Sequence, residues 1–266
     1  MADANVLVIT GYGVNSHRET AHAAYLAGAD RVDLLHFADI AQDSSRLLEY
    51  GLIVFPGGFL DGDDLGAAQA AAMRWRYLKD GRGRLVLDAL REFLSGGGLM
   101  LGICNGFQLL VKLGILPGFD GEFRREVSLA HNDSGRYEDR WVKLAVNPAC
   151  ECVFTKGLPA LYIPVRHGEG RIVASAECLA RIRADNLIAL QYAGADGKPT
   201  QEYPFNPNSS PYAIAGLTNP SGHVLGLMPH PEAFHHVTNH PAWTRAEIDP
   251  PCTLLFVNAM RYLRDH

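Results

Sequence analysis

The sequence predicts an α/β protein built on a doubly wound, mainly parallel sheet. Over the first 60 residues, three short strand-like runs at 5–10, 31–37 and 51–55 alternate with helix-compatible segments. Residues 5–10 are apolar on both faces, which is typical of a strand buried inside a parallel sheet. Between about residue 120 and residue 212 the strands become short and alternate in polarity, which predicts an antiparallel β elaboration.

The helices that complete this pattern have identifiable ends. The first follows Asn15 or Ser16 as its cap and stops at Gly28. A triple glycine at 96–98 ends another helix and precedes an apolar strand at 99–103. The expected helices cover residues 17–26, 40–48, 67–79, 84–94, 107–113 and about 253–263. Two later strands, at 214–218 and 223–228, are joined by an Asn-Pro-Ser-Gly turn.

Length and composition favour a single globular domain over residues 1–266. Of the 266 residues, 47% are hydrophobic and 20% charged, which is enough for a large core. No repeat or low-complexity linker separates the elaboration or the tail at about 233–266. The net charge is −5, and Lys and Arg are scattered, so we expect no nucleic-acid partner and no membrane partner.

The cysteines and the start of the chain bear on its compartment. There is no basic leader with a long apolar run, and no run approaches membrane-spanning length, so we expect a cytoplasmic protein. The five cysteines are an odd number without a CxxC pair, which argues against a disulfide framework and a zinc site. They are Cys104, Cys150, Cys152, Cys178 and Cys252.

Cys104 is the candidate nucleophile, because it lies where the strand at 99–103 turns into a helix. Gly102 and Gly106 flank this turn and permit positive φ or a close backbone approach. The helix N-terminus behind the turn favours the thiolate over the thiol. The alternative is that Cys104 is a small buried apolar residue, the usual fate of a free cysteine.

The glycine pair Gly57-Gly58 follows the strand at 51–55, where doubly wound folds bind their ligands. Its backbone amide can donate to a developing oxyanion, or the pair can simply form a tight turn. An oxyanion hole needs two donors, and the amide of Asn105, directly after the nucleophile, is the second candidate.

Three polar segments carry weaker signals. For Asp61, Asp63 and Asp64, a solvated loop that caps the following helix is favoured over a metal site. In the segment 167–171, reading HGEGR, we expect a turn with a solvated His167, although a general base or a metal ligand is conceivable. The segment 201–211, reading QEYPFNPNSSP, predicts a surface loop of the kind that carries recognition.

His230 and Glu232 are the candidate base and orienting carboxylate. The flanking prolines favour an extended segment, on which side chains two apart share a face. With Cys104 as nucleophile, His230 accepts its proton and Glu232 holds the imidazole. The histidines just downstream, His235, His236 and His240, are expected at the surface rather than on a metal, so no metal is expected in the chain.

Several of these motifs resemble those of one enzyme family. Gly102, Cys104, Gly106 and Gln108 match the G-x-C-x-G-x-Q nucleophile elbow of class I glutamine amidotransferases. The PGGF loop at 56–59, the HGEGR segment, the segment containing EYPFNPN and the run LGLMPHPE ending at Glu232 are more specific. Together, over roughly residues 6–232, they resemble the glutaminase subunits and domains of phosphoribosylformylglycinamidine synthase, an enzyme of purine biosynthesis.

The resemblance implies a flavodoxin-like fold with a catalytic triad of Cys104, His230 and Glu232. It also identifies Gly58 as the donor in the glycine pair. Gln108 and His167 are the implied contacts to the substrate.

The resemblance further implies L-glutamine as substrate and a separate synthetase subunit as partner. That synthetase binds ATP and the ribonucleotide, and uses the ammonia to make formylglycinamidine ribonucleotide. This chain has no P-loop, so we expect no cofactor in it, with ATP and magnesium on the synthetase.

Two loops and the tail depart from the family pattern. The first loop keeps Asn15 and Glu19 of G-x-N-C-D-x-E but not the middle, and LDGD replaces SYGD after the PGGF loop. The tail after Glu232 is longer than in the family. Two other functions stay open: another cysteine hydrolase of the same superfamily, acting on peptides, and a non-catalytic binding or regulatory module.

Overall fold

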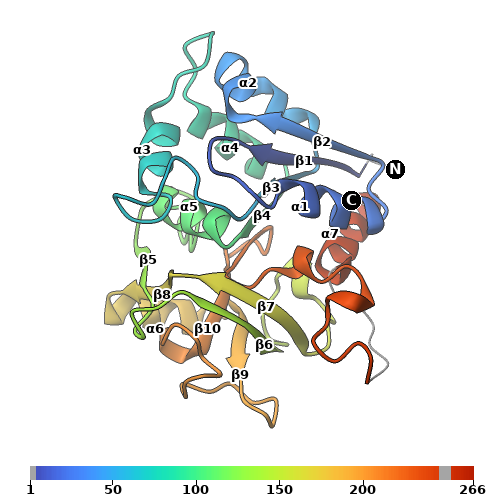
Figure 1. Ribbon diagram of the computed structural model, residues 1–266. Helices are drawn as coiled ribbons and strands as arrows, with labels where there is room; N and C mark the ends of the chain where they lie inside the picture. The colour runs from blue at the N-terminus through green and yellow to red at the C-terminus, as the bar shows by residue number, and fades with distance from the viewer. Residues whose placement is uncertain (1–3, 246–252) are drawn as a thin grey trace.

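The computed structural model describes residues 4–245 and 253–266 (Figure 1). Its main element is a nine-stranded sheet with the order β2-β1-β3-β4-β11-β10-β9-β6-β7. The first five strands in this order are mutually parallel, and the remaining four join it antiparallel. The strand order 2-1-3-4 followed by β11 is that of a flavodoxin-like doubly wound sheet, which confirms the predicted fold class.

The parallel half agrees with the sequence prediction to within a few residues at each end, except that the helix expected at 40–48 is an α-helix at Phe37–Gln42 followed by a 3-10 helix at Ser44–Glu49. Its strands are β1 (Asn5–Thr10), β2 (Arg31–His36), β3 (Leu52–Phe55), β4 (Leu99–Ile103) and β11 (Val224–Leu227). Its helices are α1 (His17–Leu26), α2 (Phe37–Gln42), α3 (Gln69–Tyr77), α4 (Val86–Ser95), α5 (Asn105–Leu113) and α7 (Leu254–Asp265). Helices α1 and α7 contact each other on one face of the sheet, and α3, α4 and α5 cover the other.

The antiparallel elaboration is a continuation of the same sheet. Strands β6 (Glu138–Val146), β7 (Leu161–His167) and β9 (Ile188–Ala193) extend its edge through β10 (Ile214–Thr218). Among the described residues, β5 (Val127–His131) and β8 (Glu169–Ala174) form a separate two-stranded sheet. Neither β5 nor α6 (Ala176–Ala184) was expected from the sequence, although Ser175 caps that helix by accepting from the backbone N–H of Cys178 at 3.1 Å.

The sheet positions the loops that carry the candidate residues. Strands β1, β3, β4 and β11 are parallel neighbours, so their carboxyl ends meet at one edge. The buried residues of β3 and β4 and of the helices beside them form one continuous core beneath that edge. Within the described ranges, no helix is long and apolar enough to cross a membrane.

Candidate active site

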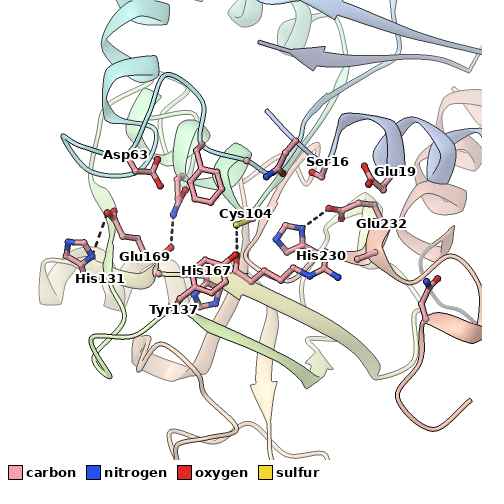
Figure 2. Close-up of a pocket in the computed structure, with 18 of the residues that line it drawn as sticks. Ser16, Glu19, Asp63, Cys104, His131, Tyr137, His167, Glu169, His230 and Glu232 are labelled. Carbon is pink, nitrogen blue, oxygen red and sulfur yellow. Dashed lines mark hydrogen bonds and ion pairs between the residues drawn. The ribbon is translucent and has the colours of Figure 1, made fainter. Parts of the chain in front are cut away.

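A cavity of about 590 Å³ lies at this edge and brings Cys104, His230 and Glu232 together. Figure 2 shows Cys104 in the middle, the His230 and Glu232 pair on one side, and Asp63 and Glu169 on the other. The predicted residues that line the cavity are Gly58, Cys104, Gln108, His167, His230 and Glu232. Asn105 follows Cys104 directly, so its backbone lies at the same turn.

Cys104 has an unusual backbone conformation at the end of β4, with φ 51° and ψ −104°. Positive φ is uncommon for a residue other than glycine and marks a strained turn. The turn is held because the Cys104 N–H donates to Leu227 O at 2.8 Å and the Cys104 carbonyl accepts from the Gln108 N–H at 3.0 Å. The thiol is largely buried, with Sγ 3.5 Å from the carbonyl oxygen of Arg166.

The two glycines of the elbow permit close approach. A Cβ on Gly102 would lie 2.7 Å from Leu110 Cδ1 and 2.8 Å from Gly106 O. Neither glycine has positive φ; Cys104 itself does. The sequence suggested either positive φ or close backbone approach as the role of these glycines. The packing of α5 against β3 and β4 requires close approach.

His230 and Glu232 are hydrogen-bonded, with Nδ1 of the imidazole 2.7 Å from Oε1 of the carboxylate. The expectation of an extended segment is wrong, because Pro231–Ala233 is a turn of 3-10 helix. The turn still brings the two side chains to one place. The backbone N–H of His230 donates to Pro164 O at 2.8 Å, which ties the segment to β7.

The surroundings of His230 favour its charged form. Burial disfavours the imidazolium, but the charges of the Glu232 carboxylate and the Cys104 thiolate outweigh it and raise the pKa of His230 to about 10. The imidazole Nε2 has no hydrogen-bond partner among the described residues. His230 is thus a charged group with a free N–H beside the candidate nucleophile.

The two backbone amides predicted to bind an oxyanion, those of Gly58 and Asn105, donate no backbone hydrogen bond among the described residues. Gly58 lines the cavity, and its N–H donates no hydrogen bond within the described part of the chain. Asn105 is the first residue of α5, so its N–H has no partner inside the helix. The side chain of Asn105 accepts from the Leu60 N–H at 3.0 Å and so connects the loop after β3 to the elbow.

Gln108 is buried, and both ends of its amide are engaged. Its Oε1 accepts from Asn105 Nδ2 at 3.1 Å, and its Nε2 donates to the carbonyl of Glu169 at 2.6 Å. These bonds join the elbow to β8. Gln108 therefore reaches the cavity wall as a side chain held by the protein.

His167 is not solvated as expected; it is 3% exposed at the end of β7. The side-chain Nδ2 of Asn132 donates to the carbonyls of Arg136 and His167, which fixes the orientation of the amide. The oxygen Oδ1 of Asn132 therefore faces Nδ1 of His167, at 3.0 Å. Nδ1 must then carry the proton, and Nε2 is an acceptor. Burial lowers the pKa of His167 to about 3, so the ring is neutral.

The loop at 201–211 is not wholly a surface loop, because Asn206, Asn208 and Ser210 are fully buried. Ser210 Oγ accepts from the Ile172 N–H at 3.0 Å and donates to Gly170 O at 3.3 Å. A Cβ on Gly170 would lie 2.8 Å from both Asn208 Nδ2 and His167 Nδ1. The loop thus supports the segment that contains His167.

The acidic loop is only partly solvated. Asp64 is exposed, whereas Asp61 forms an ion pair with Arg74 at 2.5 Å and Asp63 lines the cavity. The expectation of a solvated loop therefore holds for Asp64 alone.

The downstream histidines have separate surroundings. His235 lines the cavity and its Nδ1 is 3.2 Å from Glu232 O, while His236 pairs with Thr238. The ring of His240 packs edge-on against Trp141. Among the residues described, no group of three His, Cys, Asp or Glu is placed to hold a metal ion.

Several residues that line the cavity were not expected from the sequence. Ser16 and Glu19 come from the loop after β1 and the start of α1, and Tyr137 and Arg166 come from the antiparallel half. Asn15 and Glu19 were visible as retained family positions. Tyr137 and Arg166 had no local signal, because only the tertiary fold brings them to the cavity.

Comparison with known proteins places the chain in a family. The profile of the CobB/CobQ-like glutamine amidotransferase domain matches residues 3–263. Phosphoribosylformylglycinamidine synthase subunit PurQ of Dehalococcoides mccartyi is 40% identical over 99% of this chain and 99% of its own length. Human phosphoribosylformylglycinamidine synthase is 34% identical over 97% of this chain, which corresponds to 20% of the human protein.

Two solved structures match this chain along almost its whole length. A chain of the structure of PurLQS from Thermotoga maritima matches with a TM-score of 0.71 and 27% identity, covering 99% of this chain and 100% of that one. The glutaminase domain of Trypanosoma brucei CTPS, solved with bound acivicin, matches with a TM-score of 0.55 at 15% identity over 97% of this chain and 94% of that one, which shows a shared fold alone. The chain therefore belongs to the CobB/CobQ-like glutamine amidotransferase family and, within it, to the PurQ subunits of phosphoribosylformylglycinamidine synthase.

Proposed function

We propose that this chain hydrolyses L-glutamine to glutamate and ammonia with Cys104, His230 and Glu232 as a catalytic triad. The observation that carries the proposal is the position of Cys104, strained at the end of β4, in one cavity with the hydrogen-bonded pair His230 and Glu232. A thiol at a helix N-terminus beside an imidazolium is the arrangement that activates a cysteine nucleophile.

In the first half-reaction, the Cys104 thiolate attacks the carbon of the substrate amide. The backbone N–H groups of Gly58 and Asn105 donate to the oxyanion that forms. The His230 imidazolium transfers its Nε2 proton to the departing nitrogen, so ammonia leaves and a thioester remains on Cys104. The carboxylate of Glu232 holds the imidazole by its Nδ1 throughout.

In the second half-reaction, water attacks the thioester carbon. Neutral His230 takes a proton from this water, and the same two amides stabilise the second oxyanion. Collapse of the intermediate releases glutamate and returns the thiolate and imidazolium pair. Gln108 and His167 position the substrate from the opposite wall, where both side chains are buried.

The ammonia is delivered to a separate ATP-dependent synthetase that converts formylglycinamide ribonucleotide to formylglycinamidine ribonucleotide. The PurQ relatives and the PurLQS structure support this partner. We assign ATP and magnesium to the synthetase, because this chain has no P-loop.

The test is covalent labelling with 6-diazo-5-oxo-L-norleucine, a glutamine-like electrophile, followed by peptide mass mapping with and without a synthetase subunit. We expect one adduct, on Cys104, that excess glutamine suppresses. The variant Cys104→Ala should lose glutamine-dependent synthesis and retain ammonia-dependent synthesis in the complex, whereas Cys178→Ala should retain both. Absence of an adduct under both conditions would favour a non-catalytic module.

A further inference from the structure

The cavity continues past Cys104 on the side away from His230 and meets two carboxylates there. Asp63, in the loop after β3, and Glu169, at the start of β8, both line it (Figure 2). Glu169 is fixed, because its Oε2 accepts from the Ala67 N–H at 3.1 Å and its side chain is only 12% exposed. Asp63 Oδ1 is buried and has no hydrogen-bond partner among the described residues.

The charges around these carboxylates do not balance. The buried cation nearby is Lys112, whose Nζ donates to the carbonyl of Ala67 and which feels the charge of both carboxylates. His131 Nδ1 is 3.7 Å from Glu169 Oε1, but its side chain is 83% exposed. Burial and the charge of Glu169 raise the pKa of Asp63, as expected where negative charge exceeds positive charge. This end of the cavity thus suits a ligand that brings a positive charge.

A second observation points to a ligand that donates hydrogen bonds. His167 also lines the cavity and is 3% exposed, yet its Nε2 has no partner among the residues described. Because Asn132 fixes the proton on Nδ1, this Nε2 is a buried acceptor with nothing to accept from. The cavity therefore presents an imidazole acceptor in addition to the two carboxylates.

The position of the triad sets the direction in which a substrate lies. Its carboxamide must lie over Cys104 with the leaving nitrogen toward His230, which donates the proton. The rest of the substrate then extends away from His230, toward Asp63 and Glu169. In glutamine, that end carries an α-carboxylate and, beside it, an α-ammonium group with three N–H donors and one positive charge.

We propose that Asp63 and Glu169 bind the α-ammonium group of glutamine and thereby select α-amino acid amides over simple amides. This inference rests on the proposed glutaminase function and adds the residues that recognise the substrate. The two ends of the cavity then have different roles, because the carboxylates hold the amino acid end and the ammonia is released on the side of His230.

The test compares two reagents that alkylate the same thiol. 6-Diazo-5-oxo-L-norleucine carries an α-amino group and iodoacetamide carries none. In Asp63→Asn, the rate constant for labelling of Cys104 by 6-diazo-5-oxo-L-norleucine should fall about 10- to 100-fold, as expected for loss of a charged hydrogen bond. The rate with iodoacetamide should stay within about twofold. Glu169→Gln keeps an acceptor for the Ala67 N–H and should show the same selective loss.

Asp64→Asn is the matched control, because Asp64 is the exposed neighbour outside the cavity lining, and it should match the wild type with both reagents. The inference would be overturned if Asp63→Asn and Glu169→Gln both reacted with 6-diazo-5-oxo-L-norleucine at the wild-type rate. It would also be overturned if their rates fell equally with both reagents. If the wild-type protein reacted with iodoacetamide but not with 6-diazo-5-oxo-L-norleucine, the glutaminase function itself would be refuted. In the complex with the synthetase, the ratio of kcat/KM for glutamine to that for glutaramate, which lacks the amino group, should fall in both variants.

Discussion

The backbone of Gly106 lies against the carbonyl oxygen of Phe55, so closely that a Cβ on Gly106 would be 1.8 Å from that oxygen. This contact joins the helix behind the nucleophile to the strand that leads to Gly58. It keeps both candidate oxyanion amides at one place, since Asn105 precedes Gly106 and Gly58 follows β3.

Gly106→Ala should therefore destabilise the protein by about 3 kcal/mol or more, because neither backbone can move without opening the core. Urea unfolding followed by circular dichroism measures this. Gly96→Ala is the control, since its added Cβ would meet its nearest neighbours at an ordinary 3.5 Å. Equal stability of the two variants would show that α5 is free to shift from β3.

Glu232→Gln should reduce glutamine-dependent kcat about 10²- to 10⁴-fold while leaving the fold intact, because an amide holds the imidazole without stabilising its charge. Removing the carboxylate removes a charge that raises the pKa of His230, so the imidazolium should be lost at a lower pH than in the wild type. The pH dependence of kcat in the complex measures the shift. Glu202→Gln, at an exposed position away from the cavity, should leave the rate and the pH profile unchanged.

The pH dependence of thiol reactivity tests the pairing of Cys104 with His230. With the His230 pKa raised to about 10, the imidazolium persists through the neutral range, where its positive charge should favour attack of the Cys104 sulfur on iodoacetamide. In His230→Ala this charge is absent, so the rate of Cys104 alkylation should be lower across the neutral range. Identical profiles in the two proteins would contradict the pairing.

Much of this arrangement could be predicted from the sequence, because its signals are local. The elbow around Cys104 places glycines, a nucleophile and a helix start within a few residues, and His230 and Glu232 are two apart. The burial of His167 could not be predicted in this way. It depends on Asn132 and on the loop at 201–211, which reach it from other parts of the chain.

The antiparallel half was harder to predict because its pairing is not local. Alternating polarity identified its strands apart from β5, but this pattern does not show which sheet edge each strand joins. The strand β6 pairs with β7 and β9, and β5 pairs with β8, only because of contacts between distant segments. Asp63 was misjudged for a related reason, since the burial of its Oδ1 arises in a cavity to which β8 also contributes Glu169.

Gln108→Leu should destabilise the protein by about 1 to 3 kcal/mol, because it leaves buried Asn105 Nδ2 and the Glu169 carbonyl without partners. Thermal and urea unfolding measure the loss. Gln191→Leu is the matched control, because its hydrogen bond to Tyr212 O is exposed and water can replace it. A smaller loss at Gln108 than at Gln191 would show that water enters this wall of the cavity.

The C-terminal helix α7 is part of the core, and its removal should unfold the protein. Phe256 is fully buried, and Asn258 Nδ2 donates to the carbonyls of Phe154 and Lys156 at 3.0 Å each. Phe256→Ala should therefore cost about 3 to 5 kcal/mol, the usual cost of an aromatic cavity, and lower the Tm accordingly. Arg261→Ala, on the exposed face of the same helix, should change the Tm little. If both variants had the Tm of the wild type, α7 would contribute nothing to the stability of the fold.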